Sequence, residues 1–139
     1  MKVALQEAKS AMLKDSVPVG AVIVFKDDII ARSSNNSSHA IAHAEILAIR
    51  ASLLKLNAKV LPECDLYTTL EPCAMCSGAI SLARIKRLYF GAYDQKDASI
   101  QNGIFHHCNH SPEVYGGIME EDCSQLLKDF FQKKRQSSK

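Results

Sequence analysis

Apolar residues recur every three or four positions in several stretches of the chain, which is the spacing of a helix with one buried face. Near the start this pattern predicts a helix over residues 2–14, ended by the segment 17–20. The pattern returns over residues 42–56, 74–83 and 120–134. We therefore expect four helices.

Between these stretches lie short runs of β-branched and apolar residues, which are typical of strands. They cover residues 21–25, 29–32, 66–70, 88–92 and 114–118. A turn at 26–28 joins the first two into a predicted hairpin. The periodicity disappears over 93–112, a loop long enough to suggest a function beyond connection. Without linker or repeat, the sequence predicts a single α/β domain over residues 1–139, a three-layer fold with helices on both faces of a central mixed five-stranded sheet.

Composition excludes some classes of protein. The chain has 139 residues, of which 47% are hydrophobic and 23% charged, values ordinary for a globular domain. No apolar run approaches the roughly 18 residues of a membrane span, and the polar start of the chain lacks the apolar stretch of a signal peptide. We therefore expect a cytoplasmic protein with no membrane segment.

The five cysteines are an odd number and do not suggest a disulfide framework. Cys73 and Cys76 have the spacing of metal ligands. We interpret Cys64, Cys108 and Cys123 as small buried or half-buried thiols. A second interpretation stays open for Cys108, which could join neighbouring histidines in a second metal site. Those histidines are His106, His107 and His110.

The candidate chemistry lies in a His-x-Glu pattern that is followed along the chain by Pro-Cys-x-x-Cys. Its residues are His43, Glu45, Pro72, Cys73 and Cys76. One histidine and two cysteines give a zinc ion three ligands and leave the fourth tetrahedral position open for water, as catalytic zinc sites require. Zinc-dependent nucleobase deaminases carry this signature, with the glutamate as acid and base rather than ligand. The sequence thus predicts a catalytic Zn²⁺ site.

The spacing within each half suits one site if both halves lie at helix starts. His43 and Glu45 are two residues apart, so inside a regular helix their side chains would point about 200° apart. At a helix start the first residue is not fully helical, so the histidine can face the ion while the carboxylate approaches the water as a proton shuttle. Cys73 and Cys76 share a face in the first turn of the next helix.

Each half also has a simpler interpretation. A Cys-x-x-Cys by itself is a redox pair or half of a structural zinc knuckle, and a lone His-x-Glu carries no meaning. A closed structural zinc site would need a fourth ligand, and the cluster 106–110 is the plausible source.

Basic residues gather near the end of the chain, although the formal net charge is only +2. They are Lys128, Lys133, Lys134, Arg135 and Lys139. Two interpretations stay open. Basic side chains at the C-terminal end of a helix, and acidic side chains at its start, are favoured by the helix dipole. The same basic side chains could contact the phosphates of a nucleic acid.

Several segments resemble the bacterial tRNA-specific adenosine deaminases of the cytidine deaminase-like superfamily. They are Val-Pro-Val-Gly-Ala-Val at 17–22, Ala-His-Ala-Glu at 42–45, the run 66–79 with its Leu-Glu-Pro-Cys, Phe-Gly-Ala at 90–92 and Leu-Leu-Lys-Asp-Phe-Phe at 126–131. The resemblance implies a cytidine deaminase-like fold and hydrolytic deamination of the wobble adenosine of a tRNA to inosine. It also implies one Zn²⁺ per subunit, no organic cofactor, a homodimer and the anticodon stem-loop as partner.

The resemblance further implies contacts with the substrate. Those at the flipped base would be Asn35, the backbone of Ala44, an apolar wall of Val17, Pro18 and Val19, and Asn109 from the long loop. Those at the anticodon loop would be Asp94, Phe130, Phe131, Lys134 and Arg135. Because Phe130 and Phe131 are adjacent, we expect one in the core and the other free to stack on a base. Asn35 is equally an ordinary turn residue.

Two segments depart from the family pattern. The loop before His43 is short and ends in Ile41 and Ala42, and residues 95–103 stand in place of a Gly-rich stretch. Both bear on RNA specificity and leave the zinc chemistry untouched. Two alternatives remain: a deaminase of free guanine, cytosine or a small nucleoside such as cytidine, and a non-catalytic zinc or RNA-binding module.

Overall fold

The computed structural model describes residues 1–137, so Lys139 of the basic cluster lies outside them. One mixed sheet runs in the order β2-β1-β3-β4-β5. Its strands are β1 (Gly20–Phe25), β2 (Asp28–Ser34), β3 (Cys64–Leu70), β4 (Arg87–Ala92) and β5 (Glu113–Tyr115). β1 pairs antiparallel with β2 and β3, whereas β4 pairs parallel with β3 and β5. The predicted mixed sheet is confirmed.

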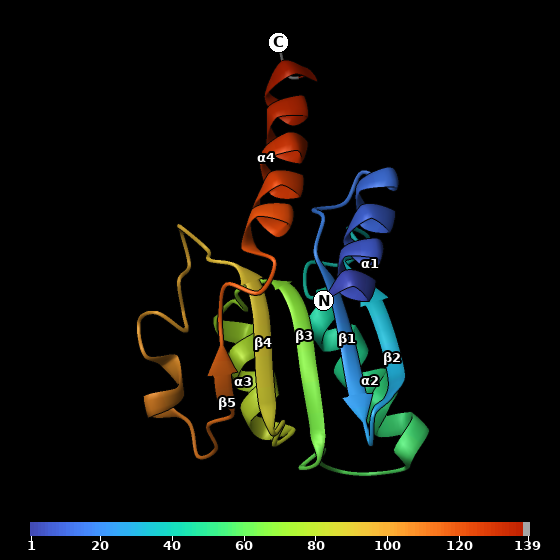
Figure 1. Cartoon of the computed structure of the whole chain (residues 1–139), viewed down its shortest axis with the longest axis vertical. Helices are drawn as coiled ribbons and strands as arrows, with labels where there is room; N and C mark the ends of the chain where they lie inside the picture. Colours follow the sequence, from blue (N-terminus) through green and yellow to red (C-terminus); the bar gives the residue numbers. More distant parts are fainter. Residues whose placement is uncertain (138–139) are drawn as a thin grey trace.

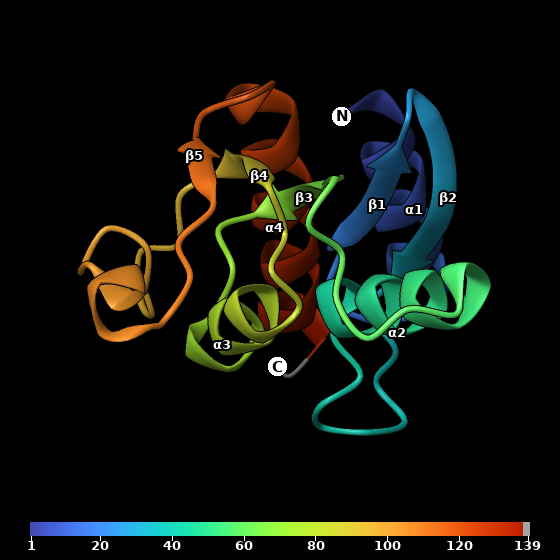
Figure 2. The same cartoon turned by 90° about the horizontal axis from the view of Figure 1, so that it is seen from below.

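The helices lie on both faces of this sheet. They are α1 (Lys2–Leu13), α2 (Ala44–Leu56), α3 (Ala74–Leu82) and α4 (Glu120–Ser137), with a short 3-10 helix, η1 (Ile104–His107). Figure 2 shows α2 and α3 on one face and α1 with α4 on the other. The predicted three-layer α/β arrangement is confirmed. Among residues 1–137, no helix combines the length and the apolar character needed to cross a membrane.

The main core fills the space between the sheet and the helices α2 and α3. Inward-facing side chains of alternate strand positions supply it, because successive residues of a strand point to opposite faces. Ile23 on β1, Leu66 on β3 and Leu88 on β4 are fully buried there and meet Ile80 of α3. A smaller cluster of Leu5, Ala92 and Cys123 lies on the other face, beneath α1 and α4.

The packing of α1 on the sheet depends on Gly20. A β-carbon at this position would come within 2.0 Å of the carbonyl oxygen of Ala4 and 2.7 Å of the amide nitrogen of Ala8. The backbone of β1 therefore touches the backbone of α1, which leaves no room for a side chain.

Several boundaries differ from the prediction for local reasons. α1 ends at Leu13, one residue before the predicted end at 14, and the left-handed φ of 60° at Asp15 stops the helix ahead of the segment 17–20. The hairpin turn is shorter than 26–28: Lys26 and Asp27 have φ values of 50° and 66°, the pair of positive angles of a two-residue type I′ turn, and β2 starts at Asp28.

The second half of the chain shows similar differences. β5 stops at Tyr115 rather than Ile118, because Gly117 has a φ of +81° and the Ile118 amide donates to the carbonyl of Phe90. The loop 93–112 contains η1, for which no periodicity was visible. α4 continues to Ser137, beyond the predicted end at 134.

The last helix extends past the end of the sheet (Figure 1). The side chains of Cys123 and Phe130 are buried and hold the first two thirds of the helix in place. Further along, the Lys134 ammonium lies 2.7 Å from the Asp15 carboxylate, which joins α4 to the turn after α1. The outer half of α4 therefore stands above the sheet with most of its surface open.

Candidate active site

His43, Cys73 and Cys76 converge on one point. Their ligand atoms lie within 4.8 Å of one another, and the Nδ1 atom of His43 is 3.6 Å from the Cys73 sulfur and 3.5 Å from the Cys76 sulfur. For bonds of about 2.3 Å to sulfur and about 2.05 Å to nitrogen, tetrahedral geometry requires a nitrogen-to-sulfur distance of about 3.6 Å. The three donors thus have the spacing of zinc ligands.

Two helix starts supply these ligands. His43 is the N-cap of α2, with an extended conformation at φ −75° and ψ 148°. Cys73 is the N-cap of α3, also extended at φ −72° and ψ 176°, and Cys76 lies in the first turn. The explanation from helix-start geometry is therefore confirmed for His43. Cys73 was expected in the first turn of this helix together with Cys76, and the structure places it just before that turn, as the N-cap that follows Pro72.

No fourth protein ligand closes the site. Within the described part of the chain, His43, Cys73 and Cys76 are the one group able to hold a metal ion. The proposed cluster at 106–110 does not contribute: His110 Nε2 lies 2.7 Å from the Ile85 carbonyl and Cys108 donates to the Ile104 carbonyl. The cluster at 106–110 therefore neither forms a second metal site nor supplies a fourth ligand to His43, Cys73 and Cys76. The three donors fit a zinc ion with an open position.

The thiols of Cys73 and Cys76 differ in pKa. A hydrogen bond with Cys76 lowers the pKa of Cys73 to about 5, and the same bond raises the pKa of Cys76, as does its burial. The start of α3 also favours negative charge. The lowered pKa favours the thiolate form of Cys73, which is the form that binds a metal ion.

Glu45 lies beside the three ligands but is not one of them. Its side chain is only 4% exposed, and its Oε1 atom has no hydrogen-bond partner. Burial raises the pKa of this carboxyl to about 7. A buried carboxyl of this pKa, with an unpartnered oxygen, has the properties of a general acid and base at neutral pH.

A cleft of about 190 Å³ opens next to His43. It is lined by Val17, Asn35, Asn36, Ser37, His39, Ala40, Ala42 and His43. Asn35 Oδ1 accepts the Ala44 amide at 2.7 Å, so this asparagine also orders the start of α2. Of the predicted apolar wall, Val17 reaches the cleft, whereas Pro18 and Val19 are buried in the interior.

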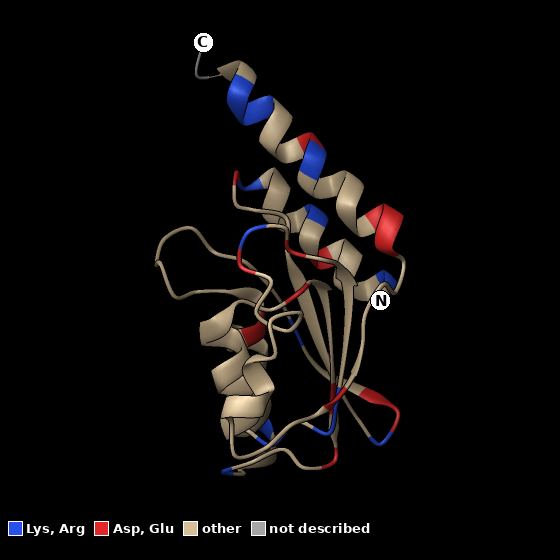
Figure 3. Ribbon diagram, turned by 90° about the vertical axis from the view of Figure 1, so that its left-hand side faces the viewer, with Lys and Arg blue, Asp and Glu red and all other residues tan. Residues whose placement is uncertain are grey.

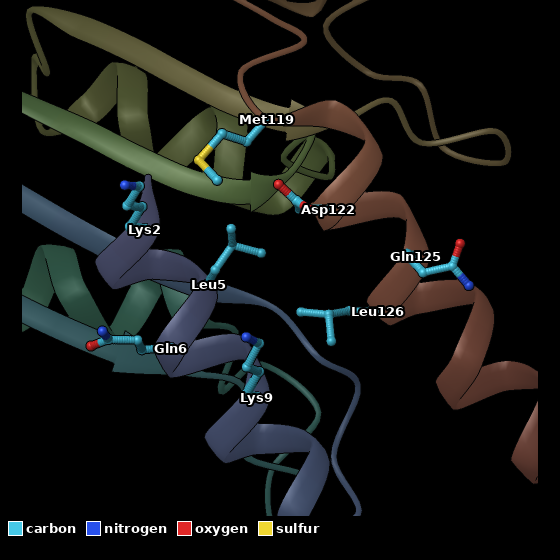
Figure 4. Close-up of a pocket in the computed structure, with 8 residues that line it drawn as sticks. All are labelled: Lys2, Leu5, Gln6, Lys9, Met119, Asp122, Gln125 and Leu126. Carbon is cyan, nitrogen blue, oxygen red and sulfur yellow. The ribbon is translucent and has the colours of Figure 1, made fainter.

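A larger cavity of about 460 Å³ lies elsewhere, between α1 and α4 (Figure 4). It is lined by Lys2, Leu5, Gln6, Lys9, Met119, Asp122, Gln125 and Leu126. It contains neither histidine nor cysteine and lies on the face of the sheet opposite α2 and α3. The larger of the two cavities therefore does not contain the candidate metal ligands.

Comparison with known proteins agrees with this geometry. The family model of the MafB19-like deaminases matches residues 1–135. The tRNA-specific adenosine deaminase of Agrobacterium fabrum is 46% identical over 97% of this chain and 93% of its own length. That of Bacillus subtilis is 41% identical over 100% of this chain and 91% of its own. This chain belongs to the tRNA-specific adenosine deaminase family.

Solved structures support the assignment. A structure from a study of A-to-I editing by tRNA:A34 deaminases matches with a TM-score of 0.88 and 46% identity, covering 91% of this deaminase and 97% of that chain. The guanine deaminase of Bacillus subtilis matches with a TM-score of 0.65 and 39% identity over 74% of this chain and 67% of its own. The cytidine deaminase-like fold expected from the sequence is confirmed.

The predicted RNA-contacting residues of this deaminase are not all at one place. Asn109 is exposed, and the amide of the adjoining His110 donates to the Ser81 hydroxyl near the C-terminal end of α3, whereas Cys73 and Cys76 lie at its start. The structure does not bring Asn109 to the cleft. Asp94 organises its own loop: its Oδ1 atom accepts the amides of Lys96 and Asp97.

The residues predicted on α4 also differ in their surroundings. Phe130 is 7% exposed and part of the interior, whereas Phe131 is 44% exposed, so the expected division between the two rings is confirmed. Lys134 is paired with Asp15, and its ammonium lies 5.6 Å from the centre of the Phe130 ring. Arg135 is exposed on the outer half of the helix.

Sequence reasoning missed two residues at this site. His39 lines the cleft from the short loop, and only its position four residues before His43 hinted at this. Glu71 is a carboxylate only 1% exposed, directly before Pro72 and Cys73. A charged residue at the end of a buried strand was the available signal. The other three cysteines, Cys64, Cys108 and Cys123, are buried or half-buried free thiols, as expected.

Proposed function

We propose that this deaminase binds one zinc ion through His43, Cys73 and Cys76 and hydrolyses the wobble adenosine of a tRNA anticodon to inosine. The observation that carries the proposal is the open three-ligand group with the buried Glu45 carboxyl beside it, one oxygen of which has no hydrogen-bond partner. The names of the relatives, with 41–46% identity over nearly the whole chain, support the choice of substrate. A tRNA substrate also supports a cytoplasmic location.

The protein moves protons through Glu45. When bound, zinc acidifies a water molecule and so provides a nucleophile at neutral pH. Glu45 takes one proton of that water as its oxygen bonds to C6 of adenine, and gives it to the ring N1. It then takes the remaining proton from the new C6 hydroxyl and gives it to the leaving amine. The C6–N6 bond then breaks, ammonia leaves, and Glu45 returns to its starting state. A pKa of about 7 allows both directions of transfer.

The RNA is recognised by α4 together with the cleft. β3 and β4 point toward the end of the sheet past which α4 extends, and Cys73 follows β3 at that end (Figure 1). Lys and Arg residues gather along the C-terminal half of α4 (Figure 3). When an anticodon loop lies over this end, its phosphates contact the Lys and Arg side chains of α4 and one of its nucleobases stacks on Phe131. Another nucleotide is flipped into the cleft.

One assay separates this function from its alternatives. The zinc-loaded protein is incubated with an adenosine-containing anticodon stem-loop, free adenine, free guanine and cytidine, and ammonia is measured. The proposal expects ammonia from the stem-loop alone. Release from guanine or cytidine would favour a small-molecule deaminase, and release from none of the substrates would favour a binding module.

Glu45→Ala tests the assigned role of the carboxylate. Zinc content should stay at one per chain, because Glu45 is not a ligand, while deamination falls by at least about a hundredfold, as for loss of a general acid and base. Loss of zinc from this variant would contradict the assignment.

We propose further that the deaminase is a homodimer that pairs through the outer face of α2 and α3. Leu54 and Leu82 are 80% and 81% exposed on these helices, and α3 carries no charged residue. If these side chains form one apolar surface, it is a candidate site for contact with a second copy of the chain. Leu82→Glu should give a monomer in sedimentation experiments. Leu13→Glu, a change of equal chemistry at a 90% exposed site on α1, should leave the dimer intact, and a dimer in both variants would refute this face.

A further inference from the structure

The buried carboxylate of Glu71 holds the loop after β4. Its Oε1 atom accepts the Asp94 amide at 3.0 Å and the Gln101 side-chain amide at 2.6 Å. Its Oε2 atom accepts the backbone amides of Ile100 and Gln101, both at 3.0 Å. Four donors from the two ends of the segment 94–101 thus meet on one carboxylate. Such hydrogen bonds to a charged acceptor are among the stronger ones in proteins.

The same loop is tied to the peptide that carries the metal ligands. The Ser99 hydroxyl donates to the Pro72 carbonyl at 2.6 Å and lies 3.1 Å from the hydroxyl of Ser77 in α3. Ser77 is adjacent to Cys76, and Pro72 is adjacent to Cys73. Ser77 and Ser99 are both buried, so water does not compete for these bonds.

The entry to α3 is therefore held from three sides. Glu71 fixes the loop, Ser99 of that loop fixes the carbonyl before Cys73, and the Glu71 amide donates to the Ala92 carbonyl of β4 at 2.8 Å. None of these groups is a metal ligand. Groups that orient metal ligands from outside the coordination sphere commonly affect metal affinity by 10- to 100-fold.

We propose that Glu71 is a positioning residue for the cysteine pair. By locking residues 94–101 against the start of α3, it holds Cys73 and Cys76 at metal-binding distance from His43 before the ion arrives. The inference rests on the metal site of the proposed function and adds a residue to which sequence analysis gave no role. It also gives the altered loop, which we had expected to leave the zinc chemistry untouched, a part in building the metal site.

Glu71→Gln is the direct test, since it keeps the size of the side chain. The Gln101 amide can turn to accept from the new amide, but the Asp94 backbone amide cannot, so one buried donor loses its acceptor. The matched control is Glu113→Gln, which makes the same chemical change at an exposed carboxylate 3.1 Å from Arg87, on the edge strand β5. Ser99→Ala removes the bond to Pro72 and leaves Glu71 in place, and serves if Glu71→Gln does not fold.

The readouts are titration with Co²⁺, whose absorption reports the geometry of its thiolate ligands, and hydrogen exchange of the amides at 94, 100 and 101. We expect Glu71→Gln to bind Co²⁺ about tenfold more weakly with a changed absorption spectrum, and its loop amides to exchange about tenfold faster. Ser99→Ala should show a smaller change in the same direction, and Glu113→Gln should match the wild type.

Two results would overturn the inference and point to different errors. If Glu71→Gln, or Ser99→Ala in its place, has the cobalt affinity and spectrum of the wild type, Glu71 stabilises the loop and does not position the cysteines, even if the melting temperature falls. If the wild-type protein itself binds no Co²⁺, the metal site of the proposed function is wrong, and the positioning role falls with it.

Discussion

Glu45→Gln in the metal-free protein measures the free-energy cost of burying the carboxylate proposed to carry protons. The glutamine has nearly the same shape but no proton to lose. Glu45 lies almost fully buried with an unpartnered oxygen, and burial raises the pKa of its carboxyl from 4.5 to about 7. The folded protein therefore keeps a proton that the unfolded chain releases, and folding stability depends on pH.

The direction and the size of this pH dependence follow from the pKa shift of Glu45. Between pH 4.5 and pH 7 the unfolded chain binds fewer protons at this position than the folded protein, so the free energy of unfolding falls as the pH rises. A shift from 4.5 to about 7 is about 2.5 units, and at 1.36 kcal/mol per unit it corresponds to about 3 kcal/mol. The stabilising effect is complete below pH 4.5 and is lost by about pH 7.

The assay is urea denaturation of both proteins with a chelator and a thiol reductant present, at pH values spaced from 4.5 to 7.5. Glu45→Gln should gain about 3 kcal/mol relative to the wild type across this range, because titrating groups distant from Glu45 affect both proteins alike and cancel in the difference. Parallel curves, with a difference that changes by less than about 1 kcal/mol, would refute the raised pKa and with it the argument for Glu45 as a proton carrier at neutral pH.

Three other changes test separate parts of the molecule. Cys73→Ala should bind zinc at least about a hundredfold more weakly and lose the stabilisation that the ion gives, as seen in a chelator competition and in the melting temperature; wild-type zinc affinity would contradict the ligand set. Phe131→Ala should lower kcat/KM for the anticodon stem-loop by about tenfold, the value of one stacked base, with an unchanged melting temperature; full activity would remove α4 from recognition. Gly20→Ala should lower the free energy of unfolding by about 3 kcal/mol in urea, because its β-carbon would overlap the backbone of α1; wild-type stability would show that the helix can move away.

The sequence predicted the parts of the fold that depend on local pattern. Helices with a regular apolar face and strands of β-branched residues were recognisable, and so was the His43, Cys73 and Cys76 group, because ligand type and spacing are written in the chain. Ends of elements were less certain. The left-handed residue Asp15 and the two-residue turn at Lys26 and Asp27 use residue types that also occur in helices and strands.

Features set by contacts distant in sequence could not be predicted. That Glu71 binds the loop at 94–101 depends on where β4 delivers that loop, and that Phe130 rather than Phe131 is buried depends on how α4 is rotated over the sheet. Asn109 was assigned to the cleft by resemblance, but the chain folds it toward the other end of α3. A motif fixes which residues meet a metal, whereas a substrate surface is fixed by the whole packing.

The order of the elements along the chain has a consequence for synthesis on the ribosome. His43, Cys73 and Cys76 and the strands β1 to β4 behind them are all translated before α4, which contributes Phe131 and the basic residues. The nascent chain therefore contains all three residues of the candidate metal site while α4, the helix proposed to contact RNA, is still inside the ribosome. With α4 in its proposed role, a deaminase synthesised in this order completes the sequence of its candidate metal site before that of its RNA-contacting helix.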